Sequence, residues 1–325
     1  MATLARAREL SFPVEARDIG FWDDGTLLLT TPSAEVWQAD IAAAAGESVL
    51  LHPANRVIQP VAEAVGLPNA EPAGGRYPRL AASALAGAVI VNTSDLVLVA
   101  CPRPGEIAGR LLHLGCGEYY PRMAFSRDGS RFTVCADTLL VFDTGSWKKK
   151  ARDDSGVFAW HPREPRLLFL DAVTGRLMWT DWRNVARPAS WPVGTLSPSE
   201  GRVEPAGLVV DATADRCVTA YRHPDRLEWW QLQPLRMVAA QPVGGEVFDL
   251  YPGPRADVFA VETEAGVQLW DFEARAPVSD VITGNTGVKS SPSGLWCVTL
   301  SRIPSNPHPM HPGEAKRTIT LWKVL

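Results

Sequence analysis

One stretch of this chain, Pro121 to Thr144, constrains the fold more than any other. It contains three short apolar runs, Met123 to Ser126, Arg131 to Ala136 and Leu139 to Phe142. The polar sequence Arg127-Asp128-Gly129 separates the first two runs and is typical of a tight turn. Short apolar runs joined by such turns are too brief for helices. The stretch therefore predicts a meander of three antiparallel β-strands.

The same pattern recurs along the chain. Phe142 ends the third run, and comparable endings follow one another about every 47 residues, near the period of four-stranded propeller blades. A further strand is expected after each third strand, for example Val49 to His52, Trp147 to Arg152 and Val278 to Thr283. The pattern thus predicts seven repeats of four strands, with the third strands marked by Trp37, Val99, Phe142, Trp179, Trp230, Trp270 and Trp322.

The two ends of the sequence complement each other in this scheme. Thr318 to Leu325 is a third strand with no fourth strand after it, whereas Glu9 to Val14 is a spare strand before the first repeat. Pairing these two strands would close a ring and remove the exposed strand edges. Pro13 is acceptable there because an outer edge strand tolerates proline.

Two sequence units carry a family resemblance. The unit from Ala124 to Asp143, with the letters AFSRDG and LLVFD, and the letters VQLWD ending at Trp270-Asp271 resemble WD-repeat β-propellers. The resemblance spans nearly the whole chain. It implies an all-β, seven-bladed β-propeller of four-stranded antiparallel blades, with the ring closed by the N-terminal strand on the C-terminal blade. It also implies a scaffolding role, because most members lack catalytic residues.

The repeats account for residues 1–325 as a single domain with three insertions. The insertions are residues 53–78, 194–205 and 302–316. In a blade of up-and-down strands, the loop from second to third strand and the loop to the next blade emerge on one side. All three insertions are therefore expected on the same face, where loops on a rigid scaffold usually bind partners.

Composition excludes several classes of function. The formal net charge is −4, without a long run of one sign, so no nucleic-acid surface is predicted. No stretch approaches the length of a membrane span or a signal peptide, and a cytoplasmic location is expected. The five cysteines show no metal-binding spacing, and buried free thiols are predicted for Cys135, Cys217 and Cys297.

Catalytic and cofactor motifs are weak. The sequence has no G-x-S-x-G elbow, and Gly284 to Ser290 lacks the following helix that a phosphate loop requires. His308 and His311, with Met310 between them, offer two imidazoles and a thioether, but a further ligand is not nearby. No metal and no cofactor are predicted.

Two groups of residues are candidates for a functional site. The first should reach the rim with the insertions and contact a protein partner, since Tyr and Arg are common interface anchors. The second lies where the first strands begin, around the mouth of a central channel. The partner-binding candidates are Arg76, Tyr77, Tyr119, Tyr120, His308, Met310 and His311, and the channel-mouth candidates are Asp18, Arg79, Arg122 and Glu246.

The sequence therefore predicts a non-catalytic protein-interaction scaffold, or a subunit of a complex, that presents rim loops to a protein partner. No membrane partner is expected. Two alternatives stay open: a propeller enzyme, either a lyase or a hydrolase, and a small-molecule sensor. Both would use the channel mouth.

Overall fold

The computed structural model describes residues 4–10, 16–31, 36–41, 79–93, 96–100, 110–113, 122–135, 139–152, 156–181, 189–195, 205–221, 225–301 and 318–325. Within these ranges every regular element is a β-strand, and no helix is long and apolar enough to cross a membrane. The strands fall into two compact units, one between residues 121 and 283 and one formed by residues 4–120 and 284–325. The predicted single domain stays a prediction.

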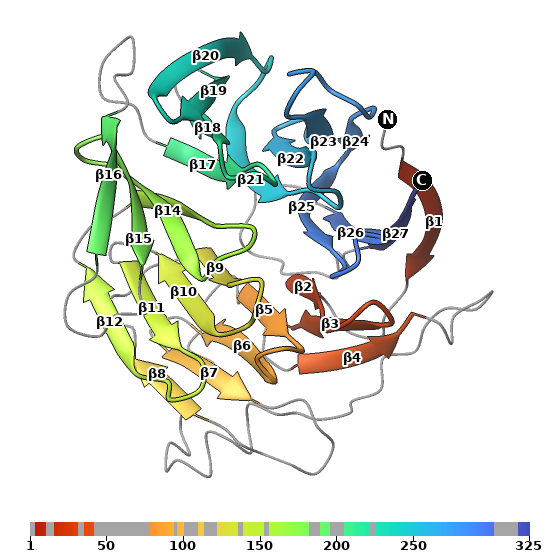
Figure 1. Cartoon of the computed structure of the whole chain (residues 1–325). Coiled ribbons are helices and arrows are strands. Elements are labelled where there is room, and N and C mark those ends of the chain that lie inside the picture. Colours follow the sequence, from red (N-terminus) through yellow and green to blue (C-terminus); the bar gives the residue numbers. More distant parts are fainter. Residues whose placement is uncertain are drawn as a thin grey trace, which may run out of the picture. The chain divides into compact units, whose positions relative to one another are not determined.

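The first unit holds four antiparallel sheets, each built from consecutive strands (Figure 1). The stretch Pro121 to Thr144 and the strand after it form the first of them, with each strand within a residue or two of its predicted bounds. The sheets are β9 (Arg122–Phe125), β10 (Arg131–Cys135), β11 (Leu139–Asp143), β12 (Lys149–Arg152); β13 (Gly156–Trp160), β14 (Arg166–Asp171), β15 (Arg176–Asp181), β16 (Ala189–Thr195); β17 (Pro205–Val210), β18 (Arg216–Tyr221), β19 (Arg226–Leu232), β20 (Leu235–Pro242); β21 (Val247–Pro252), β22 (Val258–Thr263), β23 (Gly266–Asp271), β24 (Ile282–Thr283).

The second unit holds three sheets, one of which combines the two ends of the chain. Their strands are β1 (Leu4–Leu10), β25 (Asn285–Ser290), β26 (Trp296–Ser301), β27 (Ile319–Val324); β2 (Asp18–Phe21), β3 (Thr26–Thr30), β4 (Val36–Asp40); β5 (Arg79–Ser83), β6 (Ala88–Thr93), β7 (Leu96–Ala100), β8 (Arg110–His113).

The prediction of seven four-stranded blades needs a correction. Six sheets have four strands, and the sheet β2-β3-β4 has three among the described residues. The fourth strand predicted for that sheet, Val49 to His52, lies outside the described residues. The outer strand β24 is also shorter than predicted, because the amide of Leu269 donates to the side-chain hydroxyl of Ser279 at 2.9 Å instead of to a backbone carbonyl.

The N-terminal strand β1 pairs with β27, as Figure 1 shows in red and blue. The register runs from Leu4 opposite Val324 to Leu10 opposite Ile319. The paired strand begins earlier than predicted, and its last residue, Leu10, is almost fully buried in the core of this unit. Pairing of the chain ends in one sheet is therefore observed, whereas closure of a complete ring stays a prediction.

The turns between first and second strands repeat one hydrogen bond in both units. The amide that opens the turn donates to the carbonyl that closes it, at 2.9 Å from Ser126 to Arg131 and 2.9 Å from Ser291 to Trp296. Because both units share this bond, it identifies equivalent residues in different sheets. Phe142, Trp230, Trp270 and Trp322 then face the second residue of the neighbouring strand, Phe132, Cys217, Phe259 and Cys297 respectively.

Two of the predicted marker tryptophans are off this register. Trp179 faces Leu168, one residue before the shared position, and Trp37 faces Leu29, two residues before it. Thr180 and Ala39 occupy the shared position instead. The prediction that these two tryptophans are equivalent to Phe142 is wrong in register, because a tryptophan buries well at several positions of a strand between packed sheets.

Adjacent sheets pack face to face through aromatic and branched side chains. Between the third and fourth sheets of the first unit, Trp229 contacts Phe259 and Trp270 with ring centroids 6.3 and 6.1 Å apart. Cys135, Cys217 and Cys297 are buried free thiols, as predicted. Burial raises the pKa of Cys297 to about 11. All three thiols lie in the core between strands, and burial keeps those of Cys217 and Cys297 protonated near neutral pH.

Each sheet has two distinct edges. We call the edge with the turns from first to second and from third to fourth strand the turn edge. The other edge, where second strands end and first and third strands begin, is the connection edge. In the first sheet of the first unit, Cys135 marks the connection edge, because it pairs with both Arg122 and Leu139.

Candidate interaction site at the connection edge

Three of the predicted channel-mouth residues share one position in the repeat. Asp18, Arg79 and Arg122 each pair with the fifth residue of their second strand, three residues after the position that faces the marker side chain. The strand β21 places Asp249 there, opposite Glu262. Glu246 precedes β21. The sequence did not reveal Asp249 because the strand starts before a bulge at Phe248, which shifts the pairing.

Asp18 joins two neighbouring first strands. One carboxylate oxygen accepts the amide of Ile19 at 2.9 Å, and the other accepts the amide of Leu80 in β5 at 2.8 Å. The residue is 5% exposed. Each first strand pairs with another strand of its sheet on one side only. The amide of Leu80 therefore has no strand carbonyl to bond on the other side. Asp18 satisfies that donor and stabilises the contact between the two sheets.

Asp249 has the same local geometry and a different partner. It accepts the amide of the next residue, Leu250, at 2.7 Å, just as Asp18 accepts Ile19. The same oxygen accepts Nη1 of Arg122 at 2.6 Å. The side chains of Arg122 and Asp249 are 27% and 18% exposed. The position thus holds an ion pair that solvent or a ligand can reach.

Arg122 ties together three first strands of the first unit. From β9 it donates through Nη1 to Asp249 in β21 and through Nη2 to the carbonyl oxygen of Ala206 in β17. It therefore extends past β13, whose residue at the matching position is Val157. Among the described residues the guanidinium makes only these two polar contacts, so three of its five N–H groups remain available.

This arrangement is suited to recognition through hydrogen bonds. A fixed guanidinium next to a carboxylate offers donors and an acceptor within one small area, as a peptide group or a polar side chain requires. The geometry is pre-organised, because the Arg122 side chain is held by Asp249 and Ala206 before any ligand arrives.

The predicted partner-binding residues remain untested. All of them fall outside the described residues, so their role stays a prediction. The prediction that His308 and His311 hold no metal also concerns residues outside the described part, within which no group of three His, Cys, Asp or Glu side chains is placed to hold a metal. The residues concerned are Arg76, Tyr77, Tyr119, Tyr120, His308, Met310 and His311.

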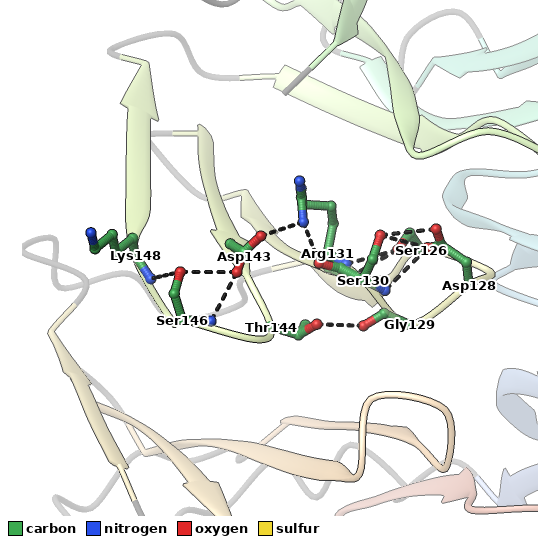
Figure 2. Close-up of polar contacts among 9 residues, drawn as sticks. All are labelled: Ser126, Asp128, Gly129, Ser130, Arg131, Asp143, Thr144, Ser146 and Lys148. Carbon is green, nitrogen blue, oxygen red and sulfur yellow. Dashed lines mark hydrogen bonds and ion pairs between the residues drawn. The ribbon is translucent and has the colours of Figure 1, made fainter. Parts of the chain in front are cut away.

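The turn edge has a different chemistry, shown for the sheet β9–β12 in Figure 2. The carboxylate of Asp128 accepts hydrogen bonds from the hydroxyls of Ser126 at 2.7 Å and Ser130 at 2.9 Å. Gly129 follows with a φ of 69°, which favours glycine. Burial raises the pKa of Asp128, but the bonds from Ser126 and Ser130 and the charge of Arg131 outweigh it, so that this pKa lies below its ordinary value.

The neighbouring turn of this sheet is closed in the same manner. Asp143 accepts the amide and the hydroxyl of Ser146 at 2.8 and 2.9 Å, and Arg131 at 2.5 Å. Thr144 then donates to the carbonyl oxygen of Gly129 at 2.7 Å and links the two turns. Every one of these bonds lies within one sheet. In this sheet the carboxylates of the turn edge therefore accept donors from their own sheet, whereas Asp18 and Arg122 bond to other sheets.

Comparisons with known proteins agree with this architecture. No model of a known protein family matches the sequence, and no curated protein matches it. Among solved structures, the chain is similar to the β-propeller domain of Cps50 (Swd1) from Myceliophteria thermophila, with a TM-score of 0.65 and 10% identity. The match covers 99% of this chain and 100% of that domain. At this identity the likeness shows the fold, an all-β propeller of antiparallel sheets, and not the function.

Proposed function

We propose that this β-propeller is a non-catalytic protein-interaction scaffold of the WD-repeat type, whose seven sheets form one closed ring. Its connection edge presents long segments to a protein partner. The proposal of a closed ring is supported by the pairing of β1 with β27 and by the similarity to a propeller domain over 99% of the chain.

The observation that carries the proposal is that the two longest connections between described strands, residues 41–78 and 302–318, both end at the connection edge, whereas the longest at the turn edge is residues 272–281. At the turn edge, residues 126–130 and 144–148 suffice to join consecutive strands of the first sheet. At the connection edge, residues 196–204 lie between β16 and β17, and residues 302–318 lie between β26 and β27. Residues 42–78, which include the predicted insertion 53–78, lead into Arg79 at this edge. Long connections on a rigid scaffold are the usual place for binding.

Arg122 and Asp249 supply a fixed contact at the same edge of their sheets. Because they are partly exposed and already oriented, a partner that docks on the long segments has a polar anchor within the first unit. The similar Cps50 (Swd1) structure is a β-propeller domain, and this likeness in fold supports a scaffold only as an analogy.

A capture experiment with matched variants tests the proposal. The baits are the intact chain, a variant with residues 302–316 replaced by a short Gly/Ser turn, and Leu85→Ser. Leu85 is 76% exposed at the turn edge between β5 and β6, so its substitution leaves the connection edge intact. The intact chain and Leu85→Ser should capture the same partner from native extract, and the loop variant should lose it.

The result must be separated from misfolding. Circular dichroism and thermal melting should be the same for the three baits, because the replaced loop lies between two strands that already pair through residues such as Val298 and Leu321. Equal capture by all three baits would place the binding surface elsewhere. If the intact chain captures no protein, the scaffold proposal is overturned in favour of a ligand at the first strands.

A further inference from the structure

Three turns of the first unit form one continuous surface at the turn edge. The hydroxyl of Thr144 donates to the carbonyl oxygen of Gly129 at 2.7 Å, which joins the turn 144–148 to the turn 127–130. Nη1 of Arg127 donates to the carbonyl oxygen of Pro162 at 3.3 Å, which joins that turn to residues 161–165 of the next sheet. These two hydrogen bonds therefore connect all three turns across two adjacent sheets.

The carboxylates of this surface are engaged within the protein. Asp128 accepts its own turn's serines, Asp143 accepts Ser146 and Arg131, and Glu164 pairs with Arg166 at 3.1 Å. Three cations are left, Arg127, Lys148 and Arg163, which we call the basic turn surface. All three are exposed, and none pairs with a carboxylate among the described residues. Figure 2 shows Lys148 directed away from Asp143 and Arg131.

The local charge is opposite to that of the whole chain. Residues 126–131, 143–148 and 161–166 contain five cations and three carboxylates, a net charge of +2, while the chain carries −4. The pKa of His161 lies below its ordinary value because the ring is buried and because the charges of Arg166 and Arg163 oppose its protonation. The positive potential at these turns thus reaches a neighbouring buried group.

The surface ends at the following sheet, where the balance of charge reverses. In the turn before β18, Asp211 and Asp215 outnumber Arg216, which pairs with Asp211 at 3.1 Å and with Glu273. A ligand attracted to the basic turn surface is therefore confined to the two sheets β9–β12 and β13–β16.

We propose that Arg127, Lys148 and Arg163 dock an acidic segment of a protein partner. Three cations across two sheets match a short run of Asp or Glu side chains and exert their attraction over about 10 Å at 0.1 M salt. A nucleic acid fits less well, because tracking its phosphates takes a longer basic stripe and the rest of this chain is acidic. The docking surface lies at the edge opposite to the long segments, so it is independent of the proposed function.

Binding of a fluorescein-labelled decaglutamate peptide, followed by fluorescence anisotropy, tests this proposal. The variant Arg127→Glu/Arg163→Glu reverses two charges of the surface. The matched control is Arg176→Glu, since Arg176 is also exposed and without a carboxylate partner in the described part but begins β15 at the connection edge. We expect the double variant to weaken binding by about tenfold or more, and the control to leave it within about twofold.

The salt dependence and two other probes complete the test. Affinity of the intact chain for the peptide should fall as NaCl rises from about 50 to 200 mM, because the contacts are exposed. Equal weakening by the double variant and by Arg176→Glu would show a non-specific charge effect and overturn the proposal. Absence of peptide binding at low salt would also overturn it, as would tighter binding of a DNA duplex or of phosphatidylserine vesicles through the same arginines. Melting curves of the variants show whether each is folded.

Discussion

The turn edge of the sheet β9–β12 and the connection edge use carboxylates in different ways. At this turn edge, Asp128 and Asp143 accept donors of their own sheet, two to 12 residues away. At the connection edge, Asp18 accepts an amide 62 residues away, and Asp249 accepts a guanidinium 127 residues away. The first kind of bond closes a turn within a sheet, and the second kind joins separate sheets. Substitutions at the two edges should therefore affect the molecule on different scales.

The largest effect is expected from removing the strand that joins the chain ends. Deletion of Met1 to Val14 removes β1 and the buried Leu10, and exposes the edge of β27. We expect aggregation and loss of cooperative thermal unfolding, measured by size-exclusion chromatography and calorimetry. Deletion of Met1 to Thr3 alone, which leaves β1, is the control and should melt like the intact chain. Unchanged melting of the longer deletion would contradict a stabilising role for this pairing.

Asp18→Ala should cause the next largest loss. It leaves the amides of Ile19 and Leu80 without their acceptor at a buried site, and a hydrogen bond to a charged group contributes about 1.5–3 kcal/mol. We expect the free energy of unfolding to fall by about 3 kcal/mol, measured by urea denaturation. Asp18→Asn, which keeps one acceptor oxygen, should lose less. A loss below about 1 kcal/mol for the alanine variant would show that water replaces the carboxylate.

The Arg122–Asp249 pair should contribute less to stability than Asp18, because it is partly exposed. We expect Arg122→Ala to lower the free energy of unfolding by about 1 kcal/mol. Asp249→Ala should cost somewhat more, since the amide of Leu250 also loses its acceptor. A double-mutant cycle measures the coupling between the two side chains. Coupling near zero would mean that the pair is not formed in solution and would remove it as an anchor.

The smallest effect concerns the turn-edge carboxylates at acid pH. The pKa values of Asp128 and Asp143 lie below their ordinary value, so each stabilises the fold above about pH 4 and loses this contribution as pH falls through its folded value. Because both are partly exposed, we expect less than about 1 kcal/mol for each. In urea denaturation between about pH 5 and 2.5, the free energy of unfolding should depend less steeply on pH for Asp128→Asn than for the intact chain. An identical slope would contradict the assignment.

The strand pattern was predictable because it depends on neighbours in sequence. Arg127-Asp128-Gly129 and the flanking apolar runs locate β9 to β11 within a residue or two. The pairing register between neighbouring strands was less predictable. A bulge at Phe248 places Asp249 at the shared position, and neither composition nor spacing marks a bulge in an apolar strand. Trp37 and Trp179 were misaligned for a related reason, since tryptophan marks burial and not a fixed pairing position.

The candidate site was predictable only in part. Arg122 was identified because it starts a first strand, but its partners Asp249 and Ala206 lie 127 and 84 residues away. Such pairs follow from the arrangement of whole sheets, which one sequence does not specify. The basic turn surface shows the same limit. Lys148 belongs to a visible run of lysines, whereas the link between its turn and the turn of Arg127 depends on Thr144 and on the strand order.

The pairing of β1 with β27 also has a consequence for synthesis on the ribosome. Leu4 to Leu10 is made before every other strand described, and Ile319 to Val324 after all of them. The sheet that contains both obtains its full set of strands only when translation has passed the last of them, and contacts so distant in sequence form slowly. Throughout elongation the N-terminal strand lacks the strand with which it pairs, and its unpaired backbone is available to chaperones or to other nascent chains.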